Sequence, residues 1–198
     1  MGVSLTRTAG TPTSKKKFTF SLWYRKPMVR DHGSSTSDMV FFNSAASNDN
    51  RLTFYINQEN SPYDQLRITG RNGGSSVLDL RTTTELEDIA AWYHIVAKVD
   101  TTQSTNTDRA KLYINGVEQQ LDTNSYPNQD VELEIQHNPY VLSYAGSGNY
   151  LQGTISHFHY CDGYAYDASS FGEFDSTSGI WVPKTAPSVT YGTNGFFL

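Results

Sequence analysis

The chain has 198 residues and a formal net charge of −5, with charged residues at 18% and aromatic residues at 13% of the sequence. Its polarity therefore comes mainly from hydroxyl and amide side chains, which excludes a charged helical bundle, and its aromatic content opposes disorder. The acidic balance argues against nucleic acid as the main partner, because phosphate binding requires a concentrated basic surface. No stretch reaches the ~20 apolar residues of a membrane span, the N-terminus lacks the apolar core of a secretion signal, and one cysteine cannot form an internal disulfide.

Alternating or β-rich runs, separated by Asn, Asp, Gly, Ser and Pro, predict a series of short strands. In the first clear run, residues 18–24, alternate apolar side chains from Phe18 to Tyr24 share one face. Asn115 and Gly116 join two later runs and form the strongest short-range signal for a hairpin. The expected strands are 18–24, 39–42, 51–56, 65–69, 76–80, 93–99, 110–114 with its continuation from 117, 131–135, 140–144, 153–161 and 195–198.

These strands predict an all-β fold in which two antiparallel sheets pack as a sandwich. One short helical turn is expected over residues 85–91, too short to change the fold class. No Pro-rich or Gly/Ser-rich linker divides the chain internally. We therefore expect a single domain over residues 1–198, with residues 1–16 as a partly extended arm.

Three segments together resemble the laminin-G and concanavalin A-like lectin/glucanase superfamily. Residues 92–100, which begin with Trp92, and residues 111–117, which carry the Asn-Gly turn, resemble its central pair of strands. Residues 153–163 resemble a penultimate strand of the same sandwich. The resemblance implies a concanavalin A-like jelly-roll sandwich, with lectins and glucanases among its relatives and calcium as the commonest cofactor.

The end of the chain is similar to a narrower group, the versions of this domain in bacteriophage virion structural proteins. This similarity lies in residues 162–165, 170–175, 179–184 and 191–198, together with the opening residues 5–8. It implies a capsid decoration protein or fibre module that is located in the virion and contacts other capsid or tail proteins. It also implies a homo-oligomer, for which a trimer is our first expectation.

Because the superfamily includes glucanases, a pair of catalytic carboxylates has to be considered. The nearest candidates are Glu132 and Glu134 in the run 131–135, but the next alternate position is Gln136, which cannot act as a general acid. We interpret this run as a solvent-facing strand with its apolar residues turned inward. The prediction is that the protein is not an enzyme.

Two patterns raise the question of a metal. His157, His159 and Cys161 alternate on one expected strand, a spacing that metal sites use. The structural alternative is that His159 and Cys161 fill the inner face of the sandwich, with Phe158 and Tyr160 on the opposite face.

Calcium would use carboxylate and carbonyl oxygens in loops. Asp100 and Asp162 are weak candidates, because each ends an expected strand and would cap a turn equally well.

Sugar binding by such sandwiches uses exposed aromatic rings beside amide and carboxylate side chains. Candidate residues lie in polar, loop-like contexts, although tyrosines also anchor protein interfaces. They are Asn124, Tyr126, Asn149, Tyr150 and Tyr63.

The stretch 164–184 carries Phe171, Phe174, Ile180 and Trp181 among Gly, Ser and Asp residues. These large apolar side chains either fold back to seal the sandwich or form a subunit contact, and the sequence slightly favours the first.

The function predicted is a non-enzymatic structural protein of the phage surface that binds through its sandwich loops, with host glycans as one target. Its partners would be virion proteins and cell-surface glycans, without nucleic acid and without membrane insertion. A free-standing carbohydrate-binding lectin is the first alternative, and a laminarinase-type glycoside hydrolase is the second.

Overall fold

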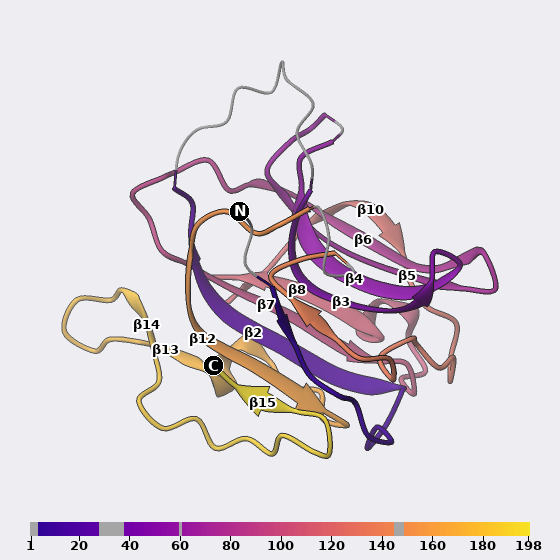
Figure 1. The fold of residues 1–198 in the computed structure, drawn as a ribbon. Helices are drawn as coiled ribbons and strands as arrows, with labels where there is room; N and C mark the ends of the chain where they lie inside the picture. Colours follow the sequence, from indigo (N-terminus) through magenta and orange to yellow (C-terminus); the bar gives the residue numbers. More distant parts are fainter. Residues whose placement is uncertain (1–3, 28–37, 60, 145–148) are drawn as a thin grey trace.

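The computed structural model describes residues 4–27, 38–59, 61–144 and 149–198 and contains two large antiparallel sheets (Figure 1). The predicted all-β sandwich of two antiparallel sheets is confirmed. Among the described residues the only helical elements are two short 3-10 turns, η1 (Asn106–Asp108) and η2 (Ala168–Ser170).

Each sheet mixes strands that are distant in sequence. The seven-stranded sheet has the order β1 (Leu5–Thr6), β11 (Tyr140–Val141), β3 (Met39–Ser47), β4 (Asn50–Asn57), β5 (Gln65–Asn72), β6 (Ser75–Glu85) and β10 (Leu121–Ser125). The six-stranded sheet has the order β15 (Phe196–Phe197), β12 (Thr154–Asp162), β2 (Lys17–Arg25), β7 (Tyr93–Asp100), β8 (Ala110–Ile114) and β9 (Val117–Glu118). A separate pair, β13 (Gly172–Phe174) and β14 (Trp181–Pro183), completes the fold.

The core lies between the two large sheets and is rich in aromatic rings. The predicted inward face of β2 is confirmed, because its alternate apolar side chains from Phe18 to Tyr24 are fully buried in the main hydrophobic cluster. Phe20 packs against Phe42 and Tyr160, with ring centroids 4.4 Å and 5.0 Å away. Each such side chain contributes roughly 1.5–3 kcal/mol by its burial.

The predicted hairpin at Asn115 and Gly116 is also confirmed. Both residues have positive φ, at 49° and 82°, which a two-residue type I′ turn requires. The side-chain oxygen of Asn115 accepts a hydrogen bond of 2.8 Å from the backbone N–H of His94, so the turn is tied to β7.

Two expected elements are wrong. Residues 131–135 form no strand: the Leu133 N–H donates to the Lys15 carbonyl and the Ile135 N–H donates back to the Leu133 carbonyl. Leu133 and Ile135 are nevertheless buried, so only the inward direction of the apolar residues was right. The expected helical turn at 85–91 is absent, because β6 continues to Glu85 and the chain then runs irregularly.

A bulge in β12 overturns the expected faces of that strand. Its pairing with β2 shifts between Ser156 and His159, and His157 has a φ of 50°. Before the bulge Ile155 packs against the core, and after it Phe158 and Tyr160 do so. One extra residue reverses the alternation of side chains. His159 and Cys161 therefore lie on the outer face, opposite to the expected arrangement.

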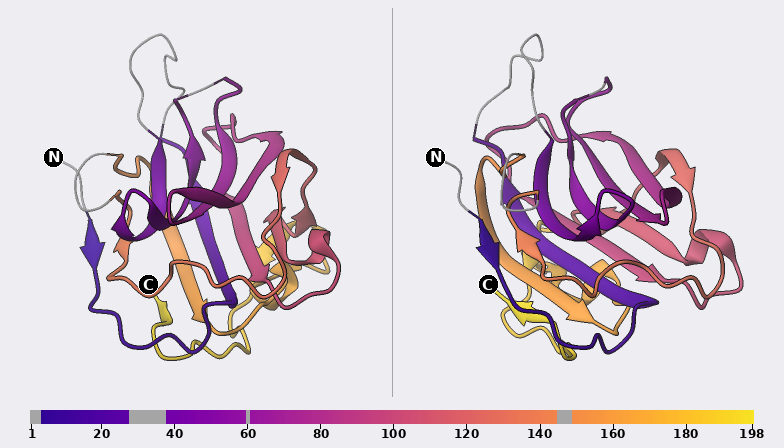
Figure 2. Two further views of the ribbon diagram at one scale, coloured as in Figure 1. Left: turned by 90° about the vertical axis from the view of Figure 1, so that its right-hand side faces the viewer. Right: turned by 45° about the vertical axis from the view of Figure 1, so that its right-hand side comes forward.

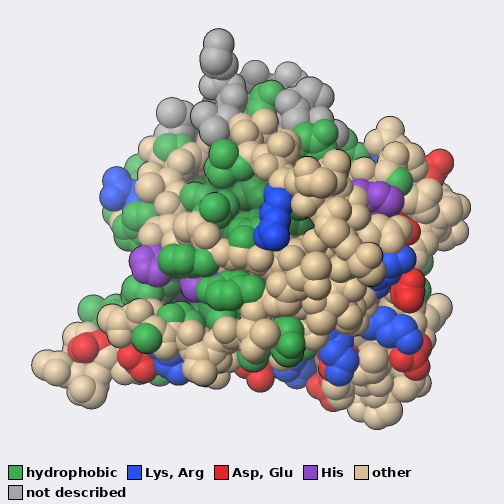
Figure 3. Space-filling model, turned by 60° about the horizontal axis from the view of Figure 1, so that its bottom comes forward, with side chains coloured by type: hydrophobic (Ala, Val, Ile, Leu, Met, Phe, Trp, Pro, Cys, Tyr) green, Lys and Arg blue, Asp and Glu red, His purple; other side chains and the backbone are tan. Residues whose placement is uncertain are grey.

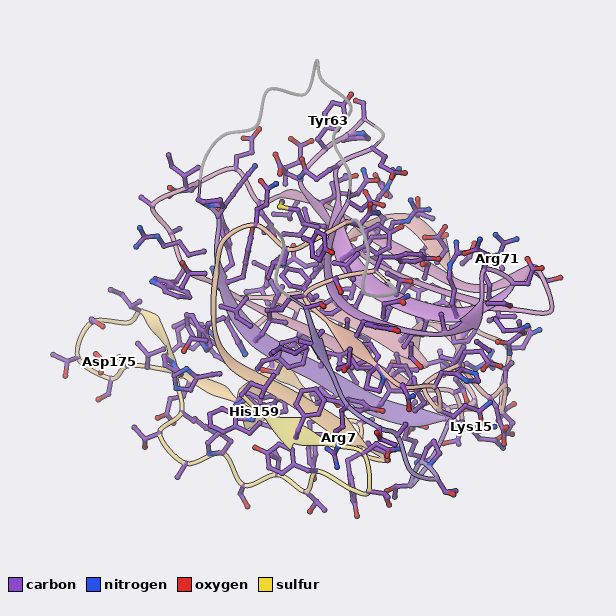
Figure 4. The ribbon with its side chains drawn as sticks, in the orientation of Figure 1. Arg7, Lys15, Tyr63, Arg71, His159 and Asp175 are labelled. Atoms are coloured by element: carbon purple, nitrogen blue, oxygen red, sulfur yellow. The ribbon has the colours of Figure 1, made fainter. Side chains whose placement is uncertain are left out.

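The two ends of the described chain meet beside the six-stranded sheet. The Arg7 guanidinium donates to the backbone carbonyls of Thr193, Asn194 and Gly195 (Figure 4). The buried carboxylate of Asp162 accepts backbone N–H groups of Thr13 and Ser14 from one end and of Asn194 from the other. Asp162 thus links β12 to both terminal segments.

The segment after β12 covers the outer face of the six-stranded sheet (Figure 2). Ala168 and Trp181 pack against Val96 and Tyr113, and Phe171 lies against His159. Phe174 and Ile180 remain exposed. Phe171 and Trp181 therefore seal the sheet, as the first explanation for residues 164–184 predicts. Phe174 and Ile180 face outward, and their part in a subunit contact stays a prediction.

Candidate functional site

A polar hollow of about 210 Å³ lies on the outer face of the seven-stranded sheet. Its floor contains Thr53 and Tyr55 of β4 and Thr69 of β5, which is directly opposite Thr53 in register. The other lining residues come from β4, from the start of β3 and from neighbouring loops: Asp38, Val40, Arg51, Glu59, Tyr144 and Asn149.

Strand alternation explains why these side chains face outward. In β4, Leu52, Phe54 and Ile56 belong to the core cluster, so Thr53 and Tyr55 point to the other face of the sheet. The same alternation places the polar residues of β5 beside them. The alternation of side chains along β4 and β5 therefore places the residues of the floor, whereas loops distant in sequence supply the rim.

Carboxylates occupy one part of the hollow. Burial raises the pKa of Asp38 above its ordinary value, and the nearby charge of Glu59 acts in the same direction. The backbone N–H groups of Gln58 and Glu59 donate to Asp38 Oδ1 at 2.8 Å and 3.3 Å and oppose that shift. These bonds orient the Asp38 carboxylate at the edge of the cavity.

Each of the two tyrosine rings in the lining of the hollow lies close to an arginine. Arg67 makes a two-pronged ion pair with Asp79, with N···O distances of 2.8 Å and 2.7 Å, and its guanidinium lies 5.9 Å from the centroid of the Tyr55 ring. On the rim, Arg51 lies 5.9 Å from the Tyr144 ring. The hollow thus combines tyrosine side chains with hydrogen-bond donors and acceptors, a combination that suits a ligand rich in hydroxyl groups.

The structure separates the binding residues predicted from sequence. Asn149 lines the hollow, and its carbonyl accepts a hydrogen bond from the Val40 N–H; Tyr150 follows it in the same loop. Asn124 lies in β10, at the far edge of the sheet from β3, and Tyr126 packs partly against the core.

Tyr63 is the fifth residue predicted to bind, and it lies in the loop after β4. Figure 4 shows it at the opposite end of the view from Arg7. The five predicted residues therefore do not form one site, and their role in binding stays a prediction.

Sequence reasoning missed Tyr55, Arg51, Asp38 and Glu59. A signal for Tyr55 was present, because the outward face of the expected strand 51–56 can be read from its alternation. Asp38 and Glu59 have no such signal, since only the pairing of β3 with β4 brings them together.

The carboxylates considered for calcium are occupied by protein donors. Asp100 accepts bonds from Thr102 and Gln103 and pairs with Lys17 at 3.2 Å; burial alone would raise its pKa, but these contacts lower it below the ordinary value. Asp162 binds the three backbone N–H groups described above. Within the described residues, no cluster of three or more His, Cys, Asp or Glu side chains could hold a metal ion.

The histidines of β12 have other partners. His159 Nδ1 bonds to the Tyr191 hydroxyl at 2.8 Å, and burial lowers the pKa of His159 to about 4. Cys161 is buried, which raises the pKa of its thiol to about 12. His157 Nδ1 bonds to the hydroxyl of Ser156 at 2.6 Å.

The two acids considered for catalysis have different partners. Glu132 is mostly exposed and pairs with Lys15 at 3.3 Å, whereas Glu134 binds His137 Nε2 at 2.7 Å. Their segment is irregular rather than a strand, so the alternate placement expected from the sequence does not occur.

None of the helices in the described residues is long and apolar enough to span a membrane.

The fold and its polar hollow define a lectin-like β-sandwich. The chain belongs to the concanavalin A-like lectin/glucanases superfamily, whose laminin-G-type family model matches residues 2–164. No curated protein sequence matches the chain closely enough to count as a relative.

Solved structures share the fold at low sequence identity. A native heptameric pentraxin from Limulus polyphemus is 14% identical with a TM-score of 0.57, over 92% of this chain and 86% of that one. Domain 4 of an extracellular arabinanase from Geobacillus stearothermophilus, in complex with arabinotriose, is 15% identical with a TM-score of 0.52, over 85% and 79% of the two chains. A tailspike protein from an Escherichia coli O157:H7 bacteriophage is 10% identical with a TM-score of 0.53, and 85% of this chain matches 22% of that chain.

Proposed function

We propose that this protein is a non-enzymatic sugar-binding module of a bacteriophage particle, and that the sugar binds in the hollow over β4 and β5. The observation that carries the proposal is the lining of that hollow. Tyr144 supplies ring surface, the largely buried Tyr55 forms part of the floor, Asp38 and Glu59 accept hydrogen bonds, and Arg51 donates them. A pyranose or furanose has apolar C–H faces and a rim of hydroxyl groups, and both parts find partners there.

Two of the similar structures agree with this class of function. The arabinanase domain was solved with arabinotriose, and the tailspike belongs to a phage. Either protein shares only the fold with this chain, so each supports the class of function rather than the identity of a sugar. An oligomeric virion protein that contacts other capsid or tail proteins is the assembly that we propose for this module.

The hydrolase alternative receives less support. Glu132 and Glu134 point to different partners, and an acid/base pair has to face one sugar ring from a common cleft. A free-standing lectin would use the same hollow, and it differs from the virion protein in its location. Antibody labelling of purified phage particles would separate the two, because only a virion protein remains on the particle.

A glycan array followed by calorimetry with the intact chain, with and without calcium, tests sugar binding. For the best ligand we expect Tyr144→Ala to weaken binding about 3- to 10-fold, since a stacked aromatic ring contributes roughly 0.5–1.5 kcal/mol. Tyr164→Ala is the matched control, because Tyr164 is exposed, stacks on Tyr166 and lies outside the hollow. An array without any ligand in both conditions would contradict the proposal, as would equal losses in the two variants.

A further inference from the structure

The three tryptophans of the chain line one apolar cavity. Trp23, Trp92 and Trp181 surround a space of about 280 Å³ on the outer face of the six-stranded sheet, and Val182 and Pro183 extend the wall. This cavity is distinct from the polar hollow on the other sheet. Its lining includes no carboxylate, lysine or arginine.

The walls of this cavity are held in place before any partner arrives. The His94 ring stacks between Trp23 and Trp181, at centroid distances of 5.1 Å and 5.9 Å. Trp181 Nε1 donates to His94 Nδ1 at 3.0 Å, which leaves His94 Nε2 to donate to the Ser21 hydroxyl at 2.9 Å. The histidine is therefore neutral and satisfied at both nitrogens, and it fixes the indole of Trp181.

Two glycines complete the support of Trp181. A Cβ atom added at Gly116 or at Gly172 would lie 2.6 Å from the indole, so only glycine permits this close approach. The Trp181 ring is thus packed against the β8–β9 turn and against β13. The cavity is a preformed feature of the fold.

Beside the cavity, the β13–β14 hairpin projects from the body of the protein (Figures 1 and 3). Asp175 lies toward its tip in Figure 4. The hairpin exposes 62% of Phe174 and 64% of Ile180, the two most exposed large apolar side chains among the described residues. Exposed apolar side chains on a projection, next to an apolar cavity, are typical of a protein contact.

Charge on the hairpin and charge near the cavity are complementary. The hairpin carries Glu173 and Asp175, both acidic. Arg25 is exposed on β2, two residues after Trp23 and therefore on the same face of the strand. No carboxylate pairs with Arg25 among the described residues.

We propose that the occupant of the cavity is a second copy of this chain, whose β13–β14 hairpin inserts Ile180 and Phe174 among the three tryptophans. In this contact Glu173 and Asp175 approach Arg25 of the other copy. A projection and a cavity in one chain allow every copy to donate and to receive, which is how closed homo-oligomers form. The inference deepens the oligomeric assembly proposed above by naming its contact, and it is independent of sugar binding because it concerns the opposite face of the sandwich.

Tryptophan fluorescence reports on this contact without background, because all three tryptophans line the cavity. With increasing concentration of the full chain, we expect a blue shift of the emission and weaker quenching by acrylamide. Sedimentation velocity should show a closed oligomer over the same range. Ile180→Ser should weaken association at least tenfold, and its exposed position leaves the fold intact, which circular dichroism verifies.

Leu5→Ser is the matched control, since Leu5 is 44% exposed on β1 of the other sheet. It should associate as the unchanged protein does. Arg25→Glu is a second test variant at an exposed position, and it should weaken association as well. A chain that stays monomeric at all concentrations would overturn the proposal, and so would unchanged association of both test variants. A monomer whose tryptophan emission shifts only on addition of a sugar would make the cavity a sugar site and overturn it too.

Discussion

The outer faces of the two large sheets differ although one sandwich carries both. The seven-stranded sheet leaves its outer face open, with a polar hollow lined in part by Tyr55 and with the Arg67–Asp79 ion pair close to the Tyr55 ring. The six-stranded sheet has its outer face covered by the segment after β12, and His94 and Trp181 lie between the layers. His94 and His159 under the cover each have specific hydrogen-bond partners, whereas the open face has a hollow with room for water or a ligand.

The difference predicts which face contributes to stability and which face serves the proposed sugar binding. A covered face removes water, so its hydrogen bonds and ring contacts are costly to break. An open face keeps its charges in high dielectric, so each ion pair there contributes little to folding. We therefore expect substitutions on the covered face to change stability and substitutions on the open face to change mainly ligand binding.

The largest effect is expected at Asp162, which joins β12 to both terminal segments. Asp162→Ala leaves the backbone N–H groups of Thr13, Ser14 and Asn194 without their acceptor, at a position where the side chain is fully buried. We expect a loss of about 3–5 kcal/mol in the free energy of unfolding, measured by urea denaturation. Asp162→Asn keeps one acceptor oxygen and should lose less; an equal loss in both variants would show that charge, and not the number of acceptors, matters.

Acid should weaken the covered face next. Burial, with a smaller effect from the charges of His159 and His157, lowers the pKa of His94 to about 3. The unfolded chain binds this proton near pH 6.5, so the stability from neutral His94 is complete above that pH and declines as pH falls toward the folded pKa. The slope is at most about 1.4 kcal/mol per pH unit for each histidine.

Urea denaturation between pH 7 and 4.5 measures this slope, and it avoids the lower range where aspartates titrate. His159, with its pKa of about 4, contributes in the same direction. His94→Gln removes one titrating group, so its profile should be flatter than that of the unchanged protein. Parallel profiles would refute the assignment to His94.

A smaller effect is expected from two glycines, one on each sheet. Gly116 and Gly73 both have positive φ, but an added Cβ meets the Trp181 ring at Gly116 and nothing within 4 Å at Gly73. Gly73→Ala should cost only backbone strain of about 1 kcal/mol, whereas Gly116→Ala should cost roughly 2 kcal/mol or more, because the indole must move. Thermal unfolding of both variants measures the difference in stability. Equal losses of stability would mean that the Trp181 indole moves aside at little cost.

The smallest effect is expected on the open face. Asp79→Asn removes the ion pair with Arg67, whose two side chains are 20% and 22% exposed. Because solvent screens such a pair, the loss should stay near 1 kcal/mol or below and should shrink as salt is added. Chemical denaturation at low and high salt tests this expectation. A salt-independent loss of several kcal/mol would mean that the open face contributes to stability as the covered face does.

Much of the fold could be predicted from local patterns. The burial of alternate residues from Phe18 to Tyr24 follows from the two-residue period of a strand, and the turn at Asn115 and Gly116 follows from the backbone angles that these residues tolerate. β10 was missed because its sequence, Leu121–Ser125, is polar and lies at a sheet edge.

The candidate site was predictable only in part. Asn149 was expected to bind and lines the polar hollow, whereas Tyr126 was expected to bind and packs partly against the core. Both belong to polar stretches with a nearby tyrosine, and sequence composition does not distinguish a rim loop from a packed one. The carboxylate of Asp38 reaches the hollow through the pairing of β3 with β4.

By itself the sequence determined the all-β class, the strand faces and the hairpin, because these depend on neighbours within a few residues. Tertiary structure alone decided which side chains of β12 point inward. The bulge at His157 reverses their alternation, and the local sequence gives no sign of that bulge. Tertiary structure also decided what covers the six-stranded sheet and what ties the terminal segments to it. Asp162 reaches Thr13 and Trp181 reaches His94 across long stretches of chain, and such contacts form only when the whole sandwich closes. Hydroxyl groups satisfy buried backbone under the cover, where the Thr19 hydroxyl bonds the Tyr164 carbonyl and the Tyr166 N–H, and on the open face Thr53 and Thr69 line the hollow proposed to bind a sugar.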